Sequence, residues 1–349
     1  MLHCKKITII AILFLCYSIA GAQVITGIVC DKSSKLPISD VYVYLDGTSI
    51  KTITDNSGKF ELTTNSIINS KLVLHHLSYE TAFINNPFEK LPDTLYLKEQ
   101  TTTLRESNIH AERFTRKQKM KAFREQFLGK STAGKSCTIT NEDDIQIEVD
   151  MQTNRLLASS DKPIEIVNNY LGYKVSFILL DFWVQYSVVN LDSDYVLGSG
   201  FAVASSFTDM APNNRRTKRR RDDVYEKSSN FFFKSFRDTI LKENKFTLFN
   251  KGFLIDHKDY FTIKDTLSQK MISIIPDTDI RTDSNYFGIE ILGMISTLYR
   301  KTDRSEIYFM INSFLVDSYG NIDRIDKVSL GGQMGENRAG DMLPTNYEP

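Results

Sequence analysis

Short runs of β-branched and aromatic residues, separated by turn residues, occupy most of positions 24–97. They predict strands at 24–30, 41–45, 50–53, 59–62, 72–76 and 94–97. Between two of these runs, Asp55 can close a turn through its side chain, and Gly58 can supply the positive φ that a tight hairpin needs. Phe60 then enters the core directly after the turn. This spacing predicts a small β-sandwich.

Specific positions in this segment match a known pattern: Gly27 and residues 37–38, 41–43, 47–48, 54–60, 74–79 and 104–106. On these positions the sequence resembles the carboxypeptidase regulatory-like domain, a transthyretin-like seven-stranded sandwich. The resemblance implies that residues 23–110 form such a sandwich and that the protein is exported. It does not imply peptidase activity, because this domain carries no catalytic residues in the zinc carboxypeptidases.

Residues 1–22 have the three parts of a secretory signal peptide. Lys5 and Lys6 form a basic start, residues 7–20 are apolar, and residues 20–22 are the small residues Ala-Gly-Ala. We therefore expect cleavage after Ala22 and export to the periplasm or outer membrane of a Gram-negative bacterium, with no transmembrane segment in the mature chain. The full sequence has 43 basic and 43 acidic residues, so the mature chain would carry a net charge of −2. This near balance argues against general nucleic-acid binding.

Residues 111–349 predict a strand-rich α+β domain of unknown function, which makes the whole chain mainly β or α+β. Helical spacing of apolar residues predicts one helix at 113–128, ended by Gly129, and a second at 222–241. A short helical turn is expected at 166–171, with strands elsewhere.

This region also resembles exported bacterial proteins that contain a carboxypeptidase-like regulatory domain and have no assigned activity. The matching positions are 127–129, Cys137, 163–166, 171–173, 221–236 and 343–347. The sequence departs from their pattern at Lys227 and Phe231, where the resemblance leads us to expect glycine and histidine. A role tied to that histidine does not transfer to this chain.

Residues 129–136 satisfy the Walker A pattern, and residues 177–181 imitate a Walker B strand. In a true P-loop, Lys135 would reach the terminal phosphate and Ser136 would hold Mg²⁺. A P-loop joins a strand to a helix, whereas here a predicted helix precedes the loop and residues 138–140 look extended. We interpret the segment as a flexible helix-to-strand connector, with nucleotide binding as the weakest alternative.

The remaining polar motifs have simpler interpretations. The basic run at 215–221 predicts a solvated loop, with docking to an acidic envelope partner as the alternative. His75 and His76 are adjacent on a predicted strand and should point to opposite faces, so they should not share a metal. His257 is expected in a surface loop.

Two cysteines, Cys30 and Cys137, remain after the leader is removed. We expect both to be small buried thiols, because free cysteine is among the most buried residue types. A disulfide that joins the two predicted domains is the alternative.

The sequence assigns no catalytic residue, cofactor or metal ligand. The leading hypothesis is a non-enzymatic cell-envelope protein. In it, the sandwich is an interaction or spacer module and the second domain binds a protein or a glycan. The alternative is an exported hydrolase, a glycosidase or peptidase-like enzyme, whose site is assembled from distant acidic residues that leave no local signature.

Overall fold

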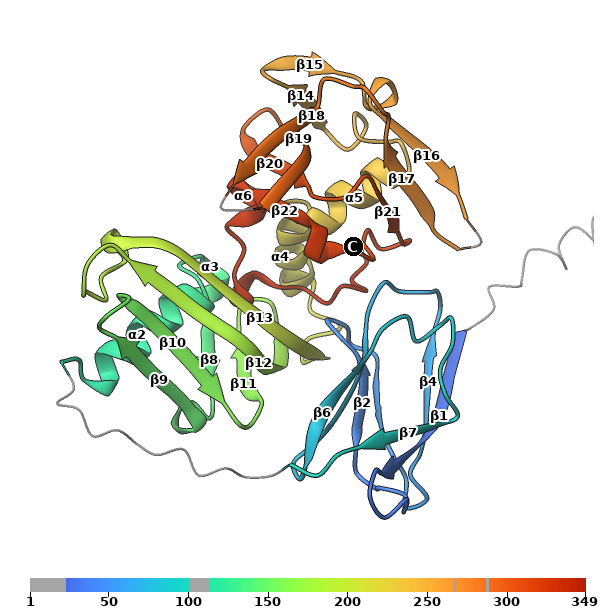
Figure 1. The fold of residues 1–349 in the computed structure, drawn as a ribbon, viewed down its shortest axis with the longest axis vertical. Coiled ribbons are helices and arrows are strands. Elements are labelled where there is room, and N and C mark those ends of the chain that lie inside the picture. Colours follow the sequence, from blue (N-terminus) through green and yellow to red (C-terminus); the bar gives the residue numbers. More distant parts are fainter. Residues whose placement is uncertain (1–22, 101–112, 267, 287–288) are drawn as a thin grey trace, which may run out of the picture.

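The computed structural model describes residues 23–100, 113–266, 268–286 and 289–349 (Figure 1). The predicted leader, residues 104–106 and His110 lie outside the described residues. Three groups of strands surround two central helices, α4 (Arg215–Tyr225) and α5 (Ser229–Arg237). In these ranges, no helix is both long enough and apolar enough to cross a bilayer.

The first group is the predicted sandwich, which is confirmed. One sheet has the order β4-β1-β7 and the other has the order β3-β2-β5-β6. The strands are β1 (Gln23–Asp31), β2 (Tyr42–Leu45), β3 (Lys51–Ile53), β4 (Lys59–Thr64), β5 (Leu72–His76), β6 (Tyr79–Ile84) and β7 (Thr94–Leu97). The sequence pattern did not reveal β6, because polar residues interrupt its apolar alternation.

The hairpin between β3 and β4 has the predicted chemistry. Asp55 Oδ1 accepts hydrogen bonds from the backbone N–H groups of Ser57 (2.8 Å) and Lys59 (2.9 Å). Gly58 has a φ of +71°, and a Cβ atom there would lie 2.5 Å from the carbonyl oxygen of Val29. Phe60 is buried in the sandwich core, as expected.

The second group is a six-stranded sheet of order β8-β11-β12-β10-β9, with β13 paired to β12. The strands are β8 (Cys137–Ile139), β9 (Ile145–Asp150), β10 (Arg155–Ser160), β11 (Ile164–Asn168), β12 (Tyr173–Tyr186) and β13 (Val196–Asp209). Helices α2 (Arg116–Phe127) and α3 (Thr132–Lys135) precede it. Phe123 and Phe127 of α2 pack on Phe182 of the sheet. This confirms the first predicted helix, which begins slightly later because Thr115 caps it.

The third group contains two sheets, ordered β15-β14-β19-β20-β22, with β18 on β19, and β16-β17-β21. The strands are β14 (Phe246–Asn250), β15 (Phe253–Ile255), β16 (Phe261–Asp265), β17 (Lys270–Ile274), β18 (Arg281–Tyr286), β19 (Ile289–Tyr299), β20 (Asp303–Phe309), β21 (Ser313–Val316) and β22 (Val328–Gly331), followed by α6 (Gly332–Gly335). Short 3₁₀ turns occur at Glu142–Asp144, Ser193–Tyr195, His257–Asp259, Ile325–Lys327 and Ala339–Asp341.

The second and third groups have separate hydrophobic cores. Phe123 and Phe177 belong to one core, and Phe232, Phe236 and Phe309 belong to the other. The predicted boundary between residues 110 and 111 lies outside the described residues, so the division into 23–110 and 111–349 stays a prediction. The predicted second domain therefore contains two cores.

Two helix predictions were only partly right. Residues 166–168 belong to β11, in which Ile164, Ile166 and Asn168 alternate into the interior. The expected turn is present but begins later: Gly172 (φ +66°) donates its N–H to the carbonyl oxygen of Asn168 (2.8 Å). The single helix predicted at 222–241 is two helices. The first of them, α4, ends at Tyr225. Ser228 then starts α5 as its N-cap, because its hydroxyl accepts a hydrogen bond from the Phe231 backbone N–H.

The basic run was also misplaced. Residues 215–221 are not a solvated loop: they form the first two turns of α4. The side chain of Arg221 is buried and bonds to the carboxylate of Asp209. The other arginines of the run face outward to different degrees, so the local sequence did not show which of them the fold would bury.

The two cysteines do not form a disulfide with each other. Cys30 and Cys137 are both free thiols, and only Cys30 is fully buried. Burial raises the pKa of Cys137 to about 12, so this thiol stays protonated at neutral pH.

The surface position predicted for His257 was wrong for its side chain, which is 13% exposed and packs edge-on against Phe236.

Candidate functional site

The sandwich and the second sheet meet along a narrow seam. Gly47 donates its backbone N–H to the carbonyl oxygen of Ser205 (2.8 Å), and Phe207 donates to that of Thr48 (2.9 Å). Beside these bonds, Tyr44 and Ala204 pack together in a small apolar cluster that also contains Val73 and Ile178. At this seam, the outer face of the β3-β2-β5-β6 sheet meets the outer face of the sheet that contains β12 and β13.

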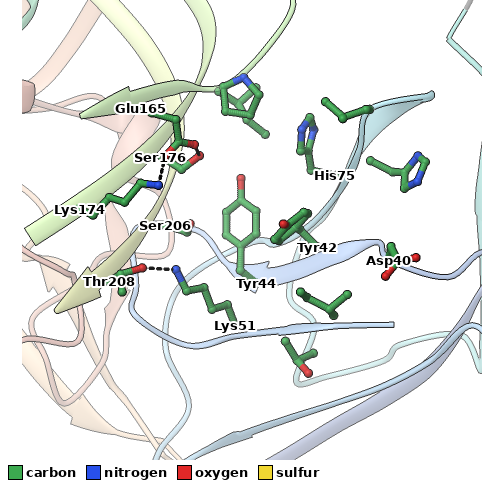
Figure 2. Close-up of a pocket in the computed structure, with 16 residues that line it drawn as sticks. Asp40, Tyr42, Tyr44, Lys51, His75, Glu165, Lys174, Ser176, Ser206 and Thr208 are labelled. Atoms are coloured by element: carbon green, nitrogen blue, oxygen red, sulfur yellow. Dashed lines mark hydrogen bonds and ion pairs between the residues drawn. The ribbon is translucent and has the colours of Figure 1, made fainter. Parts of the chain in front are cut away.

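Away from the seam, the two faces separate and enclose a groove of about 690 Å³, here called the inter-sheet groove. Ten of its lining residues are labelled in Figure 2: Asp40, Tyr42, Tyr44, Lys51 and His75 on the sandwich side, and Glu165, Lys174, Ser176, Ser206 and Thr208 on the other. The groove therefore has one wall from each of two groups of strands.

Strand alternation explains why these side chains face the groove. In β2, Val43 and Leu45 point into the sandwich core, so Tyr42 and Tyr44 point outward. In β12, the residues on either side of Ser176 enter the second core, which leaves Lys174 and Ser176 on the outer face. Two outer sheet faces thus become the walls of one groove.

Charged and hydroxyl side chains gather at one end of the groove. Lys51 Nζ reaches from β3 to Thr208 Oγ1 on β13 (2.5 Å). Lys174 Nζ lies 3.2 Å from Glu165 Oε2, and Ser176 donates its hydroxyl to Glu165 Oε1 (2.7 Å). Figure 2 shows the Lys51–Thr208 and Lys174–Glu165 contacts as dashed lines.

Burial changes the protonation behaviour of several groups here. The pKa of Lys51 is lowered, first by burial and then by the nearby charge of Lys174, while Glu165 acts in the opposite direction. Burial raises the pKa of Tyr44, and the carboxylate of Asp46 adds to this effect. Burial lowers the pKa of His75, so its imidazole is neutral at pH 7.

The two adjacent histidines both line the groove. A register shift between Leu74 and His76 interrupts the regular pairing of β5 with β6 at this point. His75 Nδ1 lies 3.0 Å from Thr81 Oγ1, and His76 Nδ1 accepts from the Ser78 backbone N–H. In the part of the chain that the structure describes, no three His, Cys, Asp or Glu side chains cluster in a way that could hold a metal ion.

The Walker-like segment has a different geometry from a phosphate loop. Its Ser131 caps the four-residue helix α3 by accepting from the Gly134 N–H, and the N–H of Lys135 bonds to the Ser131 carbonyl oxygen. A Cβ atom on Gly134 would lie 2.3 Å from the carbonyl oxygen of Leu128. The backbone N–H groups of Gly134 and Lys135 therefore bond within the turn and do not point at a phosphate site. Gly134 has no side chain because the backbone of Leu128 packs directly against it.

We therefore expect Mg²⁺-ATP to produce no concentration-dependent change in melting temperature, because a ligand that binds the native state must raise it. Thermal-shift measurements on the wild type and Lys135→Ala check this. A stabilisation that rises with ATP concentration in the wild type and disappears in Lys135→Ala would contradict the expectation.

Sequence reasoning missed the groove residues. Tyr42 and Lys174 are ordinary outward-facing strand positions, and nothing local shows that the two faces meet. One signal was present: Tyr42 and Tyr44 place two aromatic rings on the outer face of a strand whose inner face is already apolar.

Residues 25–109 match the CarboxypepD_reg-like domain. The match covers the sandwich, including β2, β3 and β5, which form one wall of the inter-sheet groove. A search of curated proteins returned no match for the chain.

Proposed function

We propose that this is a non-enzymatic cell-envelope protein that binds a glycan in the inter-sheet groove. The CarboxypepD_reg-like sandwich supplies the aromatic wall, and the second sheet supplies the hydroxyl and charged wall. The predicted leader at 1–22, with its small residues before position 23, supports the envelope location. The hydrolase hypothesis becomes an outcome of the tests below, and a protein ligand is the alternative that a lack of glycan binding would favour.

The size and lining of the groove carry this proposal. A volume of about 690 Å³ lies within the usual range for small-ligand sites, about 300–1,000 Å³. A stable protein partner instead covers about 800 Å² of each surface, usually around an apolar centre. Here tyrosine and histidine rings lie opposite short hydroxyl side chains, which suits the apolar faces and hydroxyl edges of sugar rings.

The arrangement of the acids favours binding over hydrolysis. A glycosidase needs two carboxyl groups about 5–9.5 Å apart on either side of the scissile bond. Glu165 is held by Lys174 and Ser176, whereas Asp40 lies beyond Tyr42 and Tyr44 from it in Figure 2. In Figure 2 the two acids lie on opposite sides of the two tyrosine rings and do not face each other across one point of the groove.

Replacing Tyr42 by alanine is expected to weaken glycan binding about tenfold, because it removes an exposed ring from the groove wall. Tyr96→Ala is the matched control: Tyr96 is similarly exposed (48% against 53%) but lies on β7 of the opposite sheet. Glycan-array screening of the purified protein, followed by calorimetry on the glycans bound, measures both variants.

Three results would overturn the proposal. The first is a correctly folded wild type that binds no glycan on the array. The second is equal weakening by Tyr42→Ala and Tyr96→Ala. The third is glycan hydrolysis that Glu165→Gln abolishes, which would establish the hydrolase alternative.

A further inference from the structure

Two lysines approach the same end of the inter-sheet groove from opposite walls. Lys51 comes from β3 of the sandwich, and Lys174 comes from β12 of the second sheet. Figure 2 shows both amino groups on the Glu165 side of Tyr44. The groove thus brings together two cations that are far apart in the sequence.

At this end of the groove the positive charges outnumber the negative ones, whereas Asp40, beyond the two tyrosines, makes the lining as a whole neutral. Lys174 is paired with Glu165, whereas the amino group of Lys51 bonds to the neutral hydroxyl of Thr208 and makes no ion pair within the described residues. Lys51 is exposed at its outer part; partial burial of its amino group lowers its pKa, the attraction of Glu165 opposes this, and the repulsion from Lys174 adds to it. Lys51, Lys174 and Glu165 together carry one excess positive charge, and a bound anion would relieve the cost of placing it there.

We propose that the glycan is acidic and that it places one singly charged group, a carboxylate or a sulfate ester, between Lys51 and Lys174. The inference rests on the proposed glycan-binding function. A single negative charge matches the single excess positive charge at this end, whereas a doubly charged phosphate monoester would leave one negative charge without a partner. Thr208 and Ser176 place hydroxyl groups beside the two lysines for further hydrogen bonds.

Glycan pairs that differ only in charge test the proposal. One arm compares oligogalacturonate with its methyl ester, and the other compares a sulfated galactan with its desulfated form. We expect the acidic member of at least one pair to bind at least tenfold more tightly, by about 1.4 kcal/mol. The preference should decrease as ionic strength rises.

Lysine variants connect the preference to this site. Lys51→Met and Lys174→Met should each reduce the ratio of acidic-glycan affinity to neutral-glycan affinity at least threefold. Lys32→Met, at an exposed position outside the groove, should preserve the ratio. Circular dichroism and melting temperature establish that each variant is folded.

The two proposals fail in different ways. If glycans bind but neutral and acidic members bind equally, or only neutral glycans bind, the acidic-ligand inference is wrong and the glycan-binding function stands. An acidic preference that survives both lysine substitutions also overturns the inference. If no glycan binds at all, both proposals are wrong.

Discussion

Asp317→Ala is expected to lower the free energy of unfolding by about 3–5 kcal/mol. The side chain of Asp317 is fully buried in the turn after β21. Its Oδ1 accepts from the backbone N–H groups of Tyr319 and Asn321, and its Oδ2 accepts from the Asn69 backbone N–H (2.8 Å) and the Asn321 side chain (2.9 Å). Alanine would leave these donors buried without their acceptor.

The turn lies between two groups of strands, which increases the loss of stability expected for Asp317→Ala. Asn69 belongs to the sandwich, and the ring of Tyr319 packs into the sandwich core, so Asp317 orders a contact between the first and third groups of strands. Burial raises the pKa of Asp317. Asp317→Asn should lose less stability than alanine, because the amide keeps one acceptor oxygen and carries no charge into the interior.

Urea unfolding monitored by fluorescence measures these changes. Asp326→Ala removes an exposed carboxylate from the same region and should stay within about 0.5 kcal/mol of the wild type. An Asp317→Ala protein within about 1 kcal/mol of the wild type would show that the turn is not a stabilising junction.

Arg221→Met is expected to cost a similar amount, about 3–5 kcal/mol. The side chain of Arg221 is 6% exposed and its guanidinium donates to the carbonyl oxygens of Leu171 and Gly172. It also forms two hydrogen bonds to Asp209 (2.7 and 2.8 Å) and lies 3.9 Å from the ring centre of Tyr173. Methionine fills part of the volume but leaves two carbonyl groups and a carboxylate without their donors.

The Arg221–Asp209 pair also predicts a pH dependence. The hydrogen bonds from Arg221 are the main cause that lowers the pKa of Asp209 below its usual 3.8. A lowered folded-state pKa adds stability above 3.8, and this stability is lost as the pH falls through the folded-state value. The difference in unfolding free energy between wild type and Arg221→Met should therefore shrink below pH 3.8, without vanishing, because the carbonyl contacts do not titrate.

Arg219→Met is the matched control on the same helix, because Arg219 is exposed. It should change stability by less than about 0.5 kcal/mol at any pH tested. Equal effects of the two methionine substitutions would mean that the buried guanidinium network does not stabilise the fold.

The features that could be predicted from the sequence depend on residues that are close together in the chain. The Asp55 and Gly58 hairpin needs only neighbouring residues, so its pattern survives in the fold. The first long helix was equally readable from the spacing of its apolar residues, although the capping box of Thr115 and Gln118 that sets its start was missed. At 166–171 the helical turn was placed too early, because Ile164 and Ile166 alternate as a strand that pairs with β12 through Asn168.

The groove was beyond prediction for a different reason. Lys51 and Thr208 meet only after two separately formed sheets have docked, and their contact leaves no trace in either local sequence. The same holds for Arg221, whose burial depends on Gly172 and Asp209 from other segments. Patterns along the chain predict which face of an element is apolar, but they do not predict which polar faces will be brought together.

The contacts of residues 345–346 have a consequence for biogenesis. Thr345 donates its N–H to the carbonyl oxygen of Gly47, and Ser49 donates to the side chain of Asn346, 297 positions away in the chain. The strands of the sandwich all come from residues 23–97, whereas these two contacts need residues 345–346. Because contacts between residues far apart in the sequence carry the larger loop-closure cost, these two should form after the strands of the sandwich have paired.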